Sequence, residues 1–194
     1  MTTRQLTFTR MQDTTADDWA IIATRTDTKL FEELPDRLLG ALRFLKNVDF
    51  YTVNGLQHSL QAGTRALRHG RPAEYVVAAL LHDVGDLVGP RNHAAVAASI
   101  LRPYVSQRIA WIVEHHTMFQ YHHFGHHIGI DPDLRDAYLG HPYYEDTAEF
   151  VDLYDSESFD PLYDSLPLEE LEPLLRQVFD PRQRSPFELA NRSP

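Results

Sequence analysis

The chain contains no cysteine among its 194 residues. This absence excludes disulfides, thiolate metal ligands and a cysteine nucleophile. Basic residues are also scarce, because 18 Lys and Arg stand against 28 Asp and Glu and leave a formal net charge of -10. No Lys/Arg-rich run occurs, so we expect a small-molecule partner and no nucleic acid.

Long apolar runs are missing as well. Residues 1–12 contain no apolar region typical of a signal peptide, and later runs such as 76–81 are short. A spanning helix needs about 20 apolar residues. We therefore expect a cytoplasmic protein without a membrane partner. The chain also has no strand-like alternation of useful length, no internal repeat and no low-complexity segment.

Helical periodicity is what the chain does contain. A length of 194 residues with 43% hydrophobic content suits one packed core, so we expect a single domain over residues 1–180 and a tail over residues 181–194. Helices within residues 13–46 are expected to pack on a core formed by residues 55–179. The sequence predicts an all-α fold.

Two helical hairpins are predicted in this core. The first joins a helix over residues 55–67 to one that begins at Pro72 and continues through Leu81, with Gly70 in the turn. The second joins a helix capped by Asn92 to another beyond Pro103. A loop is expected over residues 118–129. Further helices are predicted over residues 132–140, 143–158 and 168–179.

Six histidines and aspartates fall where the two hairpins and a later helix direct them to one point. His58 and His82 each lie twelve residues from Gly70, so at 1.5 Å per residue both are ~18 Å from the turn. The second hairpin repeats the arrangement around Pro103, and Asp155 lies in the later helix. Asp83 is offset by about 100° around the helix from His82, so its carboxylate is placed to bridge two metal ions. The candidate ligands are His58, His82, Asp83, His93, His116 and Asp155.

The dipeptide His82-Asp83, with His58 upstream and Asp155 downstream, resembles the HD-domain superfamily over residues 55–179. Simple HD phosphohydrolases carry these four ligands and bind one metal ion. This chain adds His93 and His116. The larger set is similar to that of the mixed-valent di-iron oxygenases of the superfamily, which include myo-inositol oxygenase and small oxygenases that cleave the carbon–phosphorus bond of hydroxylated aminoethylphosphonates.

The resemblance implies an HD-domain helical bundle with two antiparallel hairpins around a dinuclear metal site. Asp83 would bridge two iron ions, Fe(II) and Fe(III), with His58, His82 and Asp155 on one ion and His93 and His116 on the other. Dioxygen would be the cosubstrate, and no separate protein acid or base is assigned. The implied function belongs to phosphonate catabolism: oxidative cleavage of 2-amino-1-hydroxyethylphosphonate or its N-trimethyl analogue to glycine or glycine betaine and phosphate.

Four further residues are candidate substrate contacts: Tyr51, Asn54, Asp86 and Gln120. An aromatic ring at position 51 suits a trimethylammonium group through cation–π attraction, although packing of Tyr51 in the core is an equal alternative. Asp86 stands where many HD hydrolases carry Lys, so a cationic phosphate anchor is missing there. Gln120 is placed one helical turn after His116 and would bind substrate or order a ligand.

Alternatives remain open at this point. The same ligands suit a metal-dependent HD phosphohydrolase acting on a nucleotide or small phosphoester, or a binding module without turnover. His115 is an alternative metal ligand to its neighbour His116, and Asp152 is an alternative metal ligand to Asp155. The histidines at 122, 123, 126 and 127 suit a flap over the substrate better than a further metal site, and His69 and His141 are expected at the surface.

Overall fold

The computed structural model describes residues 5–183. Regular secondary structure in this range is entirely helical, and no strand occurs within it, which confirms the expected all-α class. The contacts divide the chain into two units, residues 1–37 with 180–194 and residues 38–179. Each unit is described by itself, and the expected packing of the N-terminal helices on residues 55–179 stays a prediction.

The first unit contains α1 (Ala16–Thr26), preceded by a 3₁₀ turn at Met11–Asp13. Thr15 caps α1 through a capping box, because its hydroxyl accepts from the Asp18 N–H and the Asp18 carboxylate accepts from the Thr15 N–H. A π-helical turn, Asp27–Glu32, follows. The predicted tail begins with a 3₁₀ turn at Pro181–Gln183, and its residues 184–194 lie outside those described.

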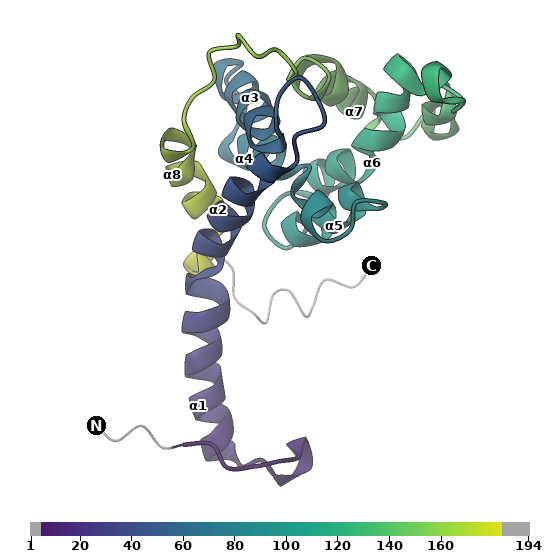
Figure 1. The fold of residues 1–194 in the computed structure, drawn as a ribbon. Helices are drawn as coiled ribbons and strands as arrows, with labels where there is room; N and C mark the ends of the chain where they lie inside the picture. The colour runs from purple at the N-terminus through teal and green to yellow at the C-terminus, as the bar shows by residue number, and fades with distance from the viewer. Residues whose placement is uncertain (1–4, 184–194) are drawn as a thin grey trace. The chain divides into compact units, whose positions relative to one another are not determined.

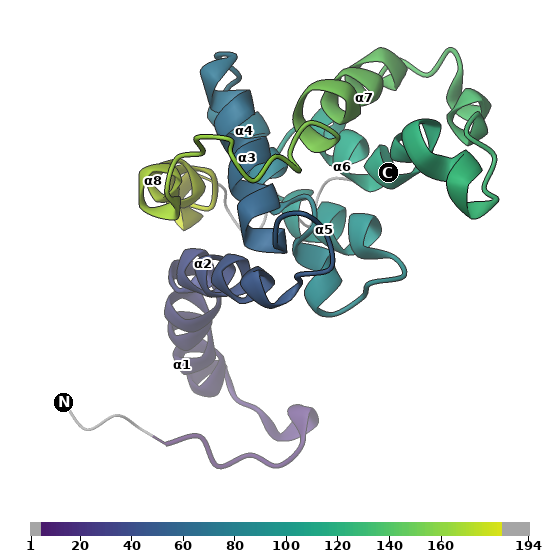
Figure 2. The same cartoon turned by 45° about the horizontal axis from the view of Figure 1, so that its top comes forward.

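The second unit begins within α2 (Leu34–Phe44), where residue 38 starts a row of buried leucines. Helix α3 packs on α4, α5 on α6, α4 on α8 and α6 on α7. Figures 1 and 2 both show α3 and α4 side by side with α8 next to them. The remaining helices are α3 (Gly55–Arg68), α4 (Ala73–Leu81), α5 (His93–Leu101), α6 (Gln107–Phe124), α7 (Tyr144–Phe150) and α8 (Leu168–Val178).

The α3–α4 hairpin forms where local signals predict it. Asn54 caps α3 through a reciprocal pair of hydrogen bonds with Gln57. Gly70 ends the turn after α3 with φ 72°, a left-handed conformation that a glycine adopts without steric cost. The Arg71 N–H then closes the turn on the Ala66 carbonyl. Pro72 directly precedes α4, so the predicted hairpin is confirmed.

The core of the second unit lies between the two hairpins and α8. Every residue of α4 from Tyr75 to Leu81 is buried, which the continuous apolar sequence of this stretch explains. Leu171 and Leu175 of α8 are completely buried and cover the α3–α4 hairpin. These contacts hold the hairpin that carries the first pair of candidate ligands.

Two sequence predictions need correction. Residues 118–129 are not a loop, because α6 continues to Phe124 and ends in a 3₁₀ turn at Gly125–Ile128. Phe119 is completely buried against other aromatic rings, and this packing outweighs the polar composition of the segment. The predicted helix over 132–140 is only a 3₁₀ turn, Leu134–Tyr138. Helix α4 ends at Leu81 as predicted, so the following His-Asp dipeptide lies beyond it.

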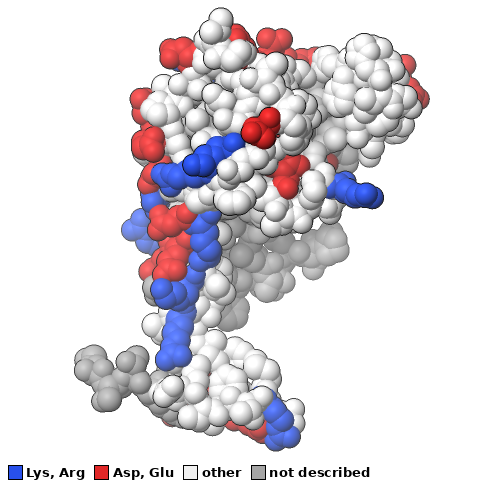
Figure 3. All heavy atoms as spheres, viewed as in Figure 1, with Lys and Arg blue, Asp and Glu red and all other residues white. Residues whose placement is uncertain are grey.

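The surface carries charges of both signs. On the face drawn in Figure 3, acidic and basic side chains lie next to one another in mixed groups. Wide uncharged areas separate these groups. In the part of the chain that the structure describes, no helix has the length and apolar character needed to cross a lipid bilayer.

Leu171→Ala tests how much α8 contributes to the core. Leu171 is completely buried, so we expect a loss of about 2 to 5 kcal/mol in the free energy of unfolding, measured with urea on the metal-free protein. Leu162 is 91% exposed, and Leu162→Ala is the control, with an expected change within about 0.5 kcal/mol. Equal unfolding midpoints for the two variants would contradict the role of α8.

Candidate metal centre

The α3–α4 hairpin brings His58 and His82 together with their Nε2 atoms 3.0 Å apart. The Nδ1 atom of His58 donates to the Ser158 carbonyl at 3.0 Å, and Nδ1 of His82 donates to the Ala79 carbonyl at 2.8 Å. Because a carbonyl oxygen only accepts, the Nδ1 atoms carry the protons of the neutral rings. Two Nε2 lone pairs therefore face each other inside the protein, an arrangement that a shared cation satisfies.

The α5–α6 hairpin makes a second pair from His93 and His116. Their Nε2 atoms lie 3.2 Å apart. Nδ1 of His116 donates to the Val113 carbonyl at 2.7 Å, and Nδ1 of His93 lies 3.4 Å from Oδ1 of Asp86. The Nε2 atoms of the second pair are directed inward like those of the first, but only His116 donates its Nδ1 to a backbone carbonyl.

Asp83 lies between the two pairs. Its Oδ2 is 3.4 Å from Nε2 of both His58 and His82. Its Oδ1 is 3.3 Å from Nε2 of both His93 and His116. The expected 100° offset along a helix was wrong, because α4 has already ended and Asp83 adopts φ -101° and ψ 6° in the turn that follows. The turn nevertheless directs one carboxylate oxygen to each pair.

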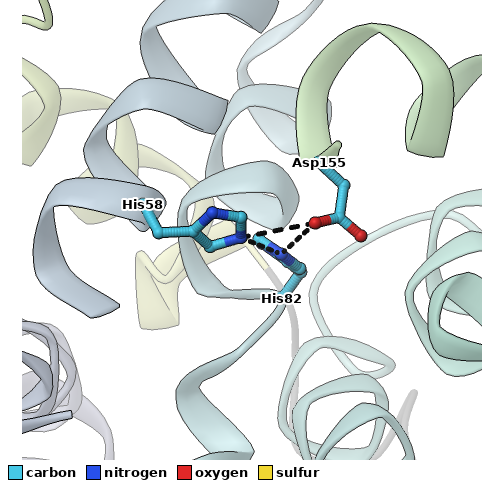
Figure 4. A group of neighbouring side chains, drawn as sticks. All are labelled: His58, His82 and Asp155. Atoms are coloured by element: carbon cyan, nitrogen blue, oxygen red, sulfur yellow. Dashed lines mark hydrogen bonds and ion pairs between the residues drawn. The ribbon is translucent and has the colours of Figure 1, made fainter. Parts of the chain in front are cut away.

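Asp155 completes the first group (Figure 4). It lies at the end of a π-helical turn, Val151–Asp155, that continues α7, and its Oδ1 is 3.4 Å from Nε2 of His58 and 3.6 Å from Nε2 of His82. The same oxygen accepts from Nε2 of Gln120 at 3.0 Å. Its Oδ2 is buried without a hydrogen-bond partner. A buried carboxylate with one oxygen beside two lone pairs and the other without a partner fits a metal ion.

The described residues therefore offer two neighbouring candidate metal positions, with one oxygen of Asp83 directed to each histidine pair. Ligand atoms of His58, His82 and Asp155 lie within 4.8 Å of one another, and so do those of His82, Asp83 and His116. All six candidate ligands are brought together. Imidazole nitrogens and carboxylate oxygens suit iron, manganese or zinc. We call the group with Asp155 the first position and the pair His93 and His116 the second position.

The electrostatics of the cluster keep both of its carboxylates ionised. Burial raises the pKa of Asp83, but the neighbouring His82, His116 and His58 outweigh it and hold that pKa well below its usual range. Asp155 behaves in the same way: burial opposes ionisation, and hydrogen bonds from the histidines lower its pKa more. Both carboxylates are therefore available as anionic ligands.

The first pair of histidines shows the opposite shift. Burial lowers the pKa of His58 and His82, but Asp155 and Asp83 outweigh burial and raise both pKa values above the ordinary value for histidine. The metal-free rings thus keep their protons up to a higher pH than free histidine does. A metal ion must displace these protons in order to bind.

Thr117 is a residue of the site that the sequence reasoning missed. Its hydroxyl oxygen lies 3.0 Å from Nε2 of His93 and 3.3 Å from Nε2 of His116. It therefore contacts the second position from the side of α6. Only its place next to His116 in the sequence could have indicated this, because threonine carries no ligand signal of its own.

A pocket of about 320 Å³ opens beside the cluster. Its lining connects to the candidate ligands at two points. The ring of Phe159 lies 4.5 Å from the ring of His58, and Gln120 binds Asp155. A small molecule in this pocket would lie against the first position. The lining residues are Tyr51, Gln120, His123, Phe124, Ser156 and Phe159.

The predicted substrate contacts lie in different surroundings. Tyr51 is 64% exposed and lines the pocket, so it does not pack in the core. Gln120 also lines the pocket while it orders Asp155. The side chain of Asn54 caps α3, and Asp86 lies next to His93. The contacts of these four residues with a substrate stay predictions.

The competing histidines and Asp152 lie outside the cluster. His115 stacks on Trp111 with ring centroids 3.9 Å apart, and His141 stacks on the same indole. His123 binds the exposed Asp152 at 3.0 Å. His122 lies 3.7 Å from the exposed Asp133. The rings of His126 and His127 contact each other. His69 is exposed and lies beside Tyr154. His116 rather than His115, and Asp155 rather than Asp152, therefore faces the other candidate ligands.

Comparison with known proteins identifies the class. The HD-domain profile matches residues 55–155, a span that contains all six candidate ligands and ends at Asp155. The chain belongs to the HD-domain family, whose members are typically metal-dependent enzymes. Comparison with curated protein sequences finds no match.

Metal affinity should rise with pH. The raised pKa values of His58 and His82 mean that these rings are partly protonated near neutrality in the metal-free protein, and the metal ion binds only the deprotonated Nε2. We expect Mn(II) to bind more tightly at about pH 8 than at about pH 6 and to release up to about two protons at the first position. Calorimetry in buffers of different ionisation enthalpy measures the affinity and the number of protons released. Binding without proton release would contradict the expected protonation of His58 and His82.

Proposed function

We propose that this chain is a di-iron oxygenase that cleaves the carbon–phosphorus bond of a small hydroxylated amino- or trimethylammonio-ethylphosphonate. The orientation of Asp83 carries the proposal, because its two oxygens face two separate imidazole pairs. A carboxylate in this orientation is suited to bridge two metal ions. A one-metal HD hydrolase would have no need of ligands at positions 93 and 116.

The proposed reaction consumes one dioxygen for each substrate. The carbon–hydrogen and carbon–phosphorus bonds of the hydroxylated carbon break, and the products are glycine or glycine betaine and phosphate. The two oxygen atoms of dioxygen balance the carboxylate and the phosphate that form. A bound Fe(II)/Fe(III) pair supplies dioxygen activation and a Lewis acid for the substrate hydroxyl. No flavin or nicotinamide is needed.

The protein contributes orientation of the ligands and an aromatic wall beside them. Gln120 holds the Asp155 carboxylate towards His58 and His82. The Phe159 ring lies 4.5 Å from the His58 ring and 5.2 Å from the Tyr51 ring, so two aromatic residues line the pocket beside the first position. The hydroxyl end of a substrate would face the metal positions, and its other end would occupy the pocket.

The pocket supports a cationic group at that other end. Three of its lining residues are aromatic, and none of the residues that line it is Lys or Arg. Burial, and after it the nearby carboxylates of Asp83, Asp86 and Asp155, raise the pKa of Tyr51 in the metal-free protein. Aromatic faces favour an ammonium group, and the metal ions would provide the positive charge for the phosphonate.

The alternative phosphohydrolase would use the same metal ligands on a nucleotide or small phosphoester. Such an enzyme benefits from a cationic contact to phosphate, yet position 86 is an aspartate that faces His93. A binding module without turnover would leave the metal ions without access from solvent. The pocket borders His58 and Asp155 through Phe159 and Gln120, which favours an enzyme, and the orientation of Asp83 towards two histidine pairs favours the oxygenase.

The requirement for dioxygen tests the proposal. The protein is reconstituted with Fe(II) and ascorbate and mixed with 2-amino-1-hydroxyethylphosphonate or its N-trimethyl analogue. We expect oxygen uptake equal to phosphate release, together with an EPR signal from a coupled Fe(II)/Fe(III) pair before substrate is added. Phosphate released at the same rate without oxygen would instead establish the hydrolase.

Two adjacent histidines provide a matched pair of variants. His116→Ala removes a candidate ligand of the second position, so we expect loss of the coupled EPR signal and a fall in kcat of at least about 100-fold. His115→Ala removes a ring that stacks on Trp111 and faces away from the cluster, and it should keep both the signal and the activity. An active His116→Ala variant would argue against the dinuclear centre.

Tyr51→Ala tests the ammonium pocket. Loss of a cation–π contact worth about 0.5 to 2 kcal/mol should raise KM for the trimethylammonium substrate by about 2- to 30-fold. Tyr51→Phe keeps the ring and should leave KM close to that of the wild type. An unchanged KM in Tyr51→Ala would show that the ring does not bind the substrate.

A further inference from the structure

The two metal positions are held differently by the chain. Three of the four inward-facing histidines donate Nδ1 to a neutral backbone carbonyl, from Ser158, Ala79 or Val113. His93 is the exception, because its Nδ1 faces the carboxylate of Asp86 at 3.4 Å. One ligand of the second position thus has a side-chain carboxylate beside its Nδ1.

The side chain of His93 also has more freedom than the other ligand rings. It is 20% exposed, whereas those of His58, His82 and His116 are 5%, 0% and 2% exposed. Packing alone therefore restrains His93 least. An imidazole that is not confined by its neighbours needs a hydrogen-bond partner to keep Nε2 directed at a metal ion.

Gly85 explains how Asp86 reaches this ring. A Cβ atom at Gly85 would lie 2.1 Å from the backbone oxygen of His93 and 2.7 Å from its carbonyl carbon, so no other residue fits without moving α5. The 3₁₀ turn Val84–Leu87 therefore touches the first residue of α5 backbone to backbone. The Asp86 N–H also bonds the Asp83 carbonyl at 3.0 Å. Asp86 is thereby placed between the bridging residue and His93.

We propose that Asp86 is a positioning residue for the second metal position, where its carboxylate holds His93 with Nε2 directed at the ion shared with Asp83. This inference rests on the dinuclear part of the proposed function and not on dioxygen chemistry or on the substrate. A carboxylate partner makes an imidazole a stronger donor than a carbonyl partner does. Asp86 therefore makes the two positions chemically unequal as well as geometrically distinct.

Mn(II) titration of the full-length protein tests this role without any enzyme assay. Free Mn(II) is counted by EPR at room temperature, and spin coupling at low temperature reports a bridged pair. We expect the wild type to bind two equivalents. Asp86→Ala should leave the first Kd unchanged and weaken the second by about 10- to 100-fold, with a matching loss of the coupled signal.

Three variants separate the possible causes. Asp86→Asn keeps an oxygen that accepts from Nδ1 but removes the charge, and we expect it to weaken the second Kd less than Asp86→Ala does. Gly85→Ala, which moves α5, should lose the second equivalent while it keeps the first. Asp152→Asn is the matched control, because Asp152 also binds a histidine, His123, but touches none of the candidate ligands.

The outcomes distinguish this inference from the dinuclear proposal. A second Kd within about twofold of wild type in both Asp86 variants would overturn the positioning role alone. Equal weakening of both equivalents in Asp86→Ala, with a lower Tm of the metal-free variant, would also overturn it, because the role would then be general stability. A wild type that binds a single equivalent would overturn the dinuclear centre and this inference together.

Discussion

The constraint on which the site depends is the direction of four imidazole lone pairs. Backbone carbonyls hold Nδ1 of His58, His82 and His116, and Asp86 faces Nδ1 of His93. In the first pair the Nε2 atoms of the neutral rings therefore converge with no proton between them, whereas the Thr117 hydroxyl lies beside both Nε2 atoms of the second pair. A folded protein tolerates such an arrangement at a cost, since buried polar atoms without partners destabilise it. A bound metal ion removes that cost, which links the fold of the two hairpins to the chemistry of the centre.

The orientation of Asp83 depends on the end of a helix. Had α4 continued through Asp83, the carboxylate would project from a regular helix face. Instead α4 ends at Leu81, and a 3₁₀ turn directs the two oxygens of Asp83 to opposite sides. The same turn brings Gly85 against α5 and Asp86 against His93. One short irregular segment thus connects both metal positions.

Local signals predicted much of the fold correctly. The Asn54 cap, the glycine turn at Gly70 and the prolines that separate helices act over a few residues, so they are legible without tertiary structure. The expected loop over 118–129 failed because the burial of Phe119 keeps α6 helical, and burial depends on distant partners. The convergence of His58 and His82 followed from hairpin register, whereas the proximity of Thr117 to His93 required the packed structure.

The sequence by itself determined the helical class, the hairpin registers and the identity of the candidate ligands, because periodicity, caps and residue spacing are encoded locally. Tertiary structure alone decided the environment of those ligands. It directed the oxygens of Asp83 to separate pairs, left Oδ2 of Asp155 without a partner and joined Gln120 to that carboxylate. The physical reason is that hydrogen bonds and burial between residues far apart in the chain arise only when the hairpins pack.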